Sequence, residues 1–161
     1  MKKSLLLFAF VATIAPVTLI SINQQAEARP VYIDEEVSEA AVGGYDTVSY
    51  FRGNGQPVKG LKKYKVKHDG RLYYFASSEN AAAFKENPAA FAPQYGGHCA
   101  WAMSRGALAP GDPVYSKIVD GKLYLNFDKR VQTIWLGDVP GFVSKADKAW
   151  PTIPDDAEFG A

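Results

Sequence analysis

The residues with the most reactive side chains lie in one short segment, Gly96-Gly97-His98-Cys99-Ala100-Trp101-Ala102-Met103. Cys99 is the only cysteine of the 161-residue chain, and His98 is one of two histidines. Met103 follows Cys99 by one helical turn, so a helix that begins at Cys99 would place both sulfur atoms on one side. Thiolate, imidazole and thioether ligands together suit Cu(I). The segment therefore predicts a metal site at His98, Cys99 and Met103 for copper or another soft metal ion.

Two other interpretations of Cys99 stay open. At a helix N-terminus the pKa of a thiol falls and the thiolate becomes a nucleophile, as in a thiol-dependent enzyme or redox protein. A histidine directly before the cysteine in the chain cannot easily take the proton of its neighbour's thiol. His68, in the other hairpin, would therefore have to act as the base in such an enzyme. Alternatively, Cys99 and Met103 are packing residues, and the protein is a partner-binding scaffold with no chemistry. Since the chain has no nucleophile elbow and no phosphate-binding loop, we expect a binding module rather than an enzyme.

The segment around Cys99 resembles an earlier part of the same chain. Residues 43–53 align without a gap on residues 96–106, at a shift of 53 positions. Residues 69–73 align on residues 120–124 at a shift of 51 positions. Spacing of this kind indicates an internal repeat, in which one supersecondary unit packs against its own copy.

The elements that position these residues follow the same plan in both copies. Asp69-Gly70 and Asp120-Gly121 are two-residue turn signals between apolar runs, so hairpins are expected over residues 64–75 and 115–127. Serine or aspartate follows each hairpin and predicts a helix cap there. The expected fold class is α+β, with two repeated β-hairpin-plus-helix units packed as one small domain.

Asp46 occupies in the first copy the position that Cys99 occupies in the second. Aspartate is a favourable N-cap, so a short helical turn is expected after it, and by the same alignment Cys99 begins a helix. Tyr45, Asp46, Tyr50 and Tyr95 are alternative candidates for lining a cleft near the glycine pairs. His68, directly before the first turn, is expected to be exposed.

The first 28 residues have the features of a secretory signal peptide. Lys2 and Lys3 precede an apolar stretch over residues 5–20, and Ala26-Glu27-Ala28 is an A-x-A cleavage signal. The stretch is shorter than the roughly 20 residues that span a bilayer. We therefore expect a periplasmic or secreted protein that begins at Arg29 and has no stable membrane insertion after cleavage.

The remaining chain divides by composition. Residues 29–42 are expected to be a mobile lead-in, residues 43–150 one domain with units at 43–95 and 96–150, and residues 151–161 a flexible tail. Removal of Lys2, Lys3 and Glu27 with the signal peptide leaves the basic and acidic residues in balance. A neutral chain gives no bulk attraction for nucleic acid, so no nucleic-acid partner is expected. The sequence names no protein partner.

Three stretches resemble the exported YHS-domain family: GYDTVSYF at 44–51, GRLYYFAS at 70–77 and YGGHCA at 95–100. The resemblance covers residues 43–106 well and continues more loosely to Trp150. It implies a YHS-type binding module, for which metal binding is the expected function. The cysteine-rich metal site of the pump-attached YHS modules does not carry over, because this chain has no cysteine before Cys99. Of the cysteines that the resemblance implies as ligands, only Cys99, in its Gly-Gly-x-Cys-Ala stretch, remains as a candidate.

Overall fold

Two antiparallel hairpins form the framework of the structure, a computed structural model that describes residues 31–33, 38–52 and 54–157. β1 (Leu61–His68) pairs with β2 (Arg71–Phe75), and β3 (Asp112–Val119) pairs with β4 (Lys122–Asn126). The Asp-Gly pair between the strands of each hairpin has positive φ at both residues, as a type I′ turn requires. The predicted α+β fold with two hairpin-plus-helix units is confirmed.

A helix with a side-chain cap follows each hairpin. Ser77 accepts a hydrogen bond from the backbone N–H of Asn80 and begins α1 (Ser78–Glu86). Asp128 accepts one from the N–H of Val131, at 2.7 Å, and begins α4 (Lys129–Leu136). The other α-helices are α2 (Pro88–Phe91), α3 (Ala100–Met103) and α5 (Val139–Ala149). Short 3-10 helices cover Ala41–Gly44, Thr47–Phe51, Gln94–Gly97 and Trp150–Thr152.

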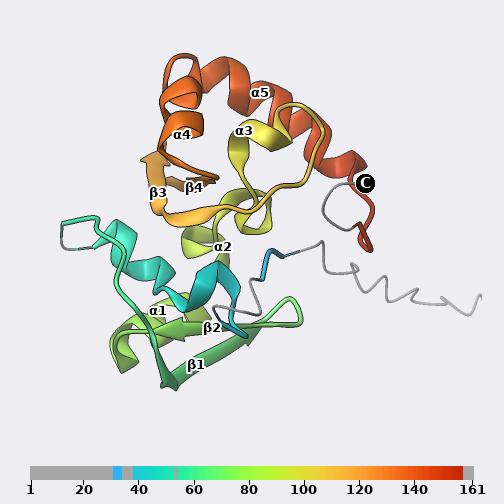
Figure 1. Cartoon of the computed structure of the whole chain (residues 1–161). Coiled ribbons are helices and arrows are strands. Elements are labelled where there is room, and N and C mark those ends of the chain that lie inside the picture. Colours follow the sequence, from blue (N-terminus) through green and yellow to red (C-terminus); the bar gives the residue numbers. More distant parts are fainter. Residues whose placement is uncertain (1–30, 34–37, 53, 158–161) are drawn as a thin grey trace, which may run out of the picture.

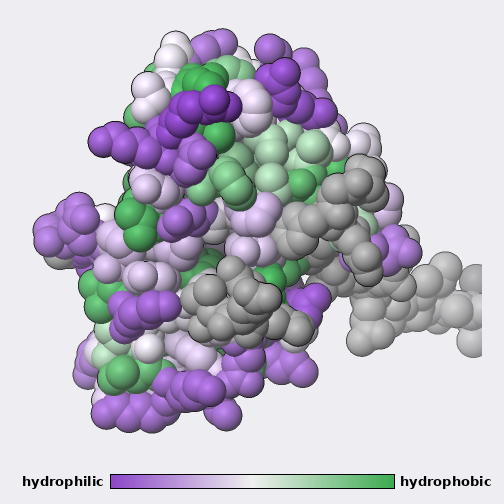
Figure 2. Space-filling view, in the orientation of Figure 1, coloured by the Kyte–Doolittle hydropathy of each residue, from purple (hydrophilic) through white to green (hydrophobic). Residues whose placement is uncertain are grey.

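The two units lie against each other, with β1, β2 and α1 in one half of the molecule and β3, β4, α3, α4 and α5 in the other (Figure 1). Leu123 and Leu125 of β4 belong to the same buried cluster as Phe75 and Phe84 of the first unit. A second cluster surrounds Trp135. β4 therefore joins the two units through a shared core. Figure 2 shows hydrophilic residues around the edge of one face and apolar residues among them near the level where the units meet.

A glycine sits where the chain enters each hairpin, and in both places the backbones approach too closely for a side chain. A Cβ atom on Gly60 would lie 2.4 Å from the carbonyl carbon of Tyr74. A Cβ atom on Gly111 would lie 2.1 Å from the carbonyl oxygen of Gly97. The two glycines are 51 positions apart, which is the shift that relates the hairpins in the sequence.

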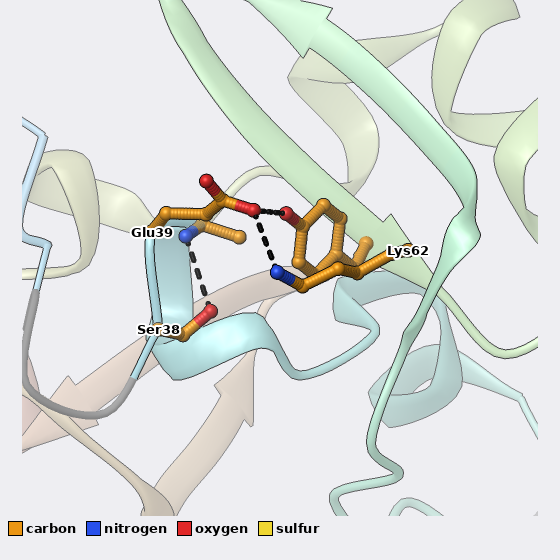
Figure 3. Close-up of polar contacts among 5 residues, drawn as sticks. Ser38, Glu39 and Lys62 are labelled. Carbon is orange, nitrogen blue, oxygen red and sulfur yellow. Dashed lines mark hydrogen bonds and ion pairs between the residues drawn. The ribbon is translucent and has the colours of Figure 1, made fainter.

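The boundaries of the folded region differ in part from the expected ones. Ala41 and Val42, which fall in the expected lead-in, are buried in the core of the first unit. Just before them, Glu39 accepts a hydrogen bond from the Tyr74 hydroxyl and pairs with Lys62 at 2.9 Å, which ties this segment to the first hairpin (Figure 3). At the other end, Ile153 packs against the second cluster.

The predicted signal peptide lies outside the described residues. Within the described part of the chain, no helix has the length and apolar character needed to cross a bilayer.

Candidate functional site

Cys99 lies at the junction between a 3-10 turn and α3. Tyr95, Gly96 and Gly97 all have positive φ, at 54°, 62° and 86°. His98 is extended, and Cys99 is the N-cap of α3, with its backbone N–H donating to the Ala109 carbonyl oxygen at 2.9 Å. The prediction that Cys99 begins a helix after the glycine pair is therefore confirmed.

The first unit contains the same backbone arrangement around Asp46. Val42, Gly43 and Gly44 have positive φ, at 57°, 56° and 73°. Asp46 then caps the 3-10 helix at Thr47–Phe51, and its N–H donates to the Val58 carbonyl oxygen at 2.8 Å. Asp46 and Cys99 thus hold equivalent places in the two units, as their alignment in the sequence predicts.

The Asp46 carboxylate is fully buried and accepts hydrogen bonds on both oxygens. Oδ1 accepts from the backbone N–H groups of Val48 and Ser49, at 2.9 and 3.2 Å. Oδ2 accepts from the N–H of Ala76 at 2.9 Å and from Nδ2 of Asn80 at 2.7 Å. Burial of a carboxylate is costly unless hydrogen bonds replace its hydration, and four donors do so here. Asp46 is therefore a structural anchor in the core, and it lines neither cavity described below.

The Cys99 thiol stands in an equivalent set of backbone amides. Burial raises the pKa of this thiol, whereas the backbone N–H groups of Ala102, Phe127 and Trp101 lower it. Burial is the larger effect, so the pKa lies above its usual value. Trp101 and Ala102 follow Cys99 by two and three positions, as Val48 and Ser49 follow Asp46. Phe127 follows the second hairpin as Ala76 follows the first.

The side chain of Asn126 lies beside this sulfur. Its Oδ1 lies 4.0 Å from Cys99 Sγ, and the side chain is fully buried. Nδ2 of Asn126 has no hydrogen-bond partner within the described part of the chain. The thiol therefore lies in a closed, donor-rich environment with only 1% of the residue exposed.

The other two predicted ligands are buried in different surroundings. The His98 ring lies 6.0 Å from the ring of Tyr32 and 6.2 Å from that of Trp150, between centroids. Met103 belongs to the Trp135 cluster, whereas Cys99 belongs to a small cluster with Ala102 and Val131. All three residues are thus in the interior, but Cys99 and Met103 lie in separate clusters. Among the described residues, no group of three His, Cys, Asp or Glu side chains could hold a metal ion.

His68 contributes to a cavity of about 760 Å³ between the two units. Its Nε2 lies 3.2 Å from the Asp69 carboxylate, and its ring meets Phe84 edge-on. The side chain is 30% exposed, so the histidine expected to be exposed is instead half-buried, because its ring packs on Phe84. Other lining residues are Tyr73, Glu86, Gln94, Tyr95, Lys122 and Trp150. Sequence reasoning missed Lys122 and Trp150, whose positions carry no local signal for a cavity.

A second cavity, of about 530 Å³, is lined by residues of both units, among them Gly43 of the first and Pro113 of the second. Tyr45, Lys59 and Phe127 line it, and Lys59 Nζ donates to the Gly43 carbonyl oxygen at 2.9 Å. Of the tyrosines expected to line a cleft, Tyr45 lines this cavity and Tyr95 the larger one. Tyr50 is buried, and its hydroxyl donates to the carbonyl oxygen of Pro113.

Comparison with known protein families finds a match to the YHS domain. The model of the YHS domain matches residues 53–95, a segment that holds the first hairpin, α1 and α2 and ends three positions before His98. No curated protein and no solved structure matches the chain. Metal binding is loosely associated with the YHS domain, so the match suggests a metal-binding module without identifying the metal or its ligands. Residues 53–95 are therefore similar to a YHS domain, in agreement with the resemblance of the sequence.

Proposed function

We propose that this protein is an exported YHS-type binding module that holds Cu(I) at the Cys99 thiolate. The observation that carries the proposal is the set of backbone amides of Ala102, Phe127 and Trp101 around the sulfur, which favours its charged form. Burial opposes that form, and a bound cation offsets the cost because metal binding displaces the thiol proton. A dry, thiolate-containing interior suits a soft ion better than a hard one.

His98 and Met103 are the further ligands in this proposal. Both are buried, at 3% and 0% exposure, so together with Cys99 they would keep the ion away from water. Because Met103 packs in the cluster of Tyr124 and Trp135, its approach to the ion would change the surroundings of these rings. Copper binding is therefore expected to alter the near-UV circular dichroism of the protein.

The proposal is tested by anaerobic Cu(I) titration against a chromophoric chelator. Wild type should compete for the ion, Cys99→Ser should lose binding, and Met103→Leu should bind more weakly with an unchanged far-UV spectrum. Exchanges between leucine and methionine are tolerated in protein cores because the two side chains have similar volumes, so Met103→Leu should keep the fold. Equal weak binding by wild type and Cys99→Ser would end the metal proposal.

Export is part of the proposal. The basic start, the apolar stretch and the A-x-A signal support cleavage after Ala28. N-terminal sequencing of the protein from its native source should find Arg29 first. Intact Met1 on a membrane-extracted species would contradict export.

We also propose that the two units arose as an internal repeat over residues 43–95 and 96–150. The equivalent helix starts at Asp46 and Cys99 and the equivalent glycines at Gly60 and Gly111 support it. In an experimental structure the two units should superpose, with Phe84 over Trp135. A mismatch of these two rings would count against the repeat.

A second candidate function is favoured by the cavity of about 760 Å³ between the units, which lies in the size range of small-molecule sites. Tyr95 and Trp150 provide aromatic surface there, and His68 and Lys122 provide polar groups. Ligand screening by NMR on metal-free protein tests this candidate. Shifts confined to the Trp150 indole and the His68 ring would support it, and an unresponsive spectrum would count against it.

A further inference from the structure

We propose that Cys99 is a site of oxidation by hydrogen peroxide, and that the donors around its sulfur are arranged to hold the two oxygens of a cysteine sulfinate. The inference concerns the metal-free protein and does not depend on copper binding. It rests on the equivalence of Cys99 and Asp46 and on the surroundings of Asn126.

The first argument is the match between a sulfinate and the carboxylate of Asp46. In each group the atom bonded to Cβ carries two oxygens, which share one negative charge. In the first unit the two oxygens accept hydrogen bonds from the backbone N–H groups of Val48, Ser49 and Ala76. The N–H groups of Trp101, Ala102 and Phe127 hold the equivalent positions in the second unit, and they act on the Cys99 thiol by lowering its pKa against the effect of burial. A thiol has no oxygen to accept from these donors, whereas a sulfinate has two.

The second argument is an amide that lacks a partner. In the first unit, Nδ2 of Asn80 is the fourth donor to Asp46, at 2.7 Å. The alignment puts Val131 at the place of Asn80, but Asn126 brings its own side-chain amide within 4.0 Å of the sulfur. Nδ2 of Asn126 is buried and makes no hydrogen bond to any described residue. A sulfinate oxygen would accept from it once the amide turns about its own axis.

The chemistry balances with peroxide as the only oxidant. Burial keeps Cys99 as the thiol. Its sulfur attacks one peroxide oxygen, so an S–O bond forms as the O–O bond breaks, and the departing hydroxide takes the thiol proton and leaves as water. A second peroxide repeats the step on the sulfenic sulfur and gives the sulfinic acid, whose proton passes to solvent. Sulfur supplies both electron pairs, which reduce the two peroxide molecules. Because Cys99 is the only cysteine, the sulfenic acid cannot be diverted into a disulfide within the chain.

Access to the sulfur is restricted to small reagents. Cys99 is 1% exposed, and Ala102 and Val131, which pack against it, are each only 8% exposed, so a reagent reaches the sulfur only when this cluster opens. A small neutral oxidant is expected to enter by local opening, while bulky thiol reagents react far more slowly.

The test treats metal-free protein with hydrogen peroxide and follows intact mass and thermal stability. We expect the mass of two added oxygens, mapped to the peptide that contains Cys99, and a melting temperature above that of the reduced protein. Addition of three oxygens as the first stable product, no addition, or a lower melting temperature for the sulfinate would overturn the proposal.

Substitution gives an independent readout without oxidation. Cys99→Asp places a carboxylate where the proposal places the sulfinate, and Cys99→Asn is the matched neutral variant of nearly the same shape. We expect Cys99→Asp to melt at or above wild type and Cys99→Asn to melt below it. If Cys99→Asp melts below Cys99→Asn, the site does not favour an anion with two oxygens, and the proposal fails whatever the result of copper titration.

Discussion

Replacement of Asp46 with alanine tests the role of the buried carboxylate in the first unit. The substitution removes the N-cap of the helix at Thr47–Phe51, a loss of about 1 kcal/mol. It also leaves the Ala76 N–H and the Asn80 amide without their acceptor, and an unsatisfied buried donor costs about 1–3 kcal/mol. We therefore expect Asp46→Ala to lower the free energy of unfolding by about 3–7 kcal/mol, out of a typical total of about 5–15 kcal/mol.

Urea unfolding followed by tryptophan fluorescence measures this loss. The matched control is Asn80→Ala, which removes one donor together with its hydrogen bond and should cost about 1 kcal/mol. The double variant should cost less than the sum of the single variants, because the two side chains share one hydrogen bond. A loss below about 1 kcal/mol for Asp46→Ala would refute the view that this carboxylate anchors the first unit.

Three further predictions concern other parts of the fold. Trp135→Ala should lower the free energy of unfolding by about 3–5 kcal/mol, because the indole is fully buried in the second cluster, and chemical denaturation checks it. Gly111→Ala should destabilise the protein far more than Gly121→Ala, since only the first Cβ would meet backbone atoms; similar melting temperatures would contradict this. The hydrogen bond from Tyr74 and the interaction with Lys62 lower the pKa of Glu39 below its usual value of 4.5. The ionised Glu39 therefore stabilises the folded state at neutral pH, and this contribution is lost as the pH falls through the lowered pKa. Tyr74→Phe should raise the Glu39 pKa toward 4.5 in an NMR titration, and an unchanged titration would show that the hydroxyl has no effect.

Much of the fold was accessible from the sequence because its signals are local. The Asp-Gly turns fix both hairpins, and aspartate at position 46 fixes a helix start through its own hydrogen bonds. The alignment of Asp46 with Cys99 also gave the correct start of α3. These features depend on a few neighbouring residues, which is why sequence patterns identify them.

The surroundings of the site were not accessible, because they depend on contacts between distant segments. The sequence places Met103 one turn after Cys99, yet α3 is only four residues long and packs between two clusters, so the two sulfur atoms have different neighbours. The sequence did not predict that Asn126 lies beside Cys99, because the two residues are 27 positions apart and only the folding of β4 brings them together. Burial of Ala41 and Val42 likewise depends on the tertiary core.

The most direct test of the proposed function is elemental analysis of the protein purified anaerobically from its native compartment. The account predicts stoichiometric copper in wild type and none in Cys99→Ser purified in the same way. Metal-free wild type with an intact thiol, or equal copper in both proteins, would contradict a copper site at Cys99.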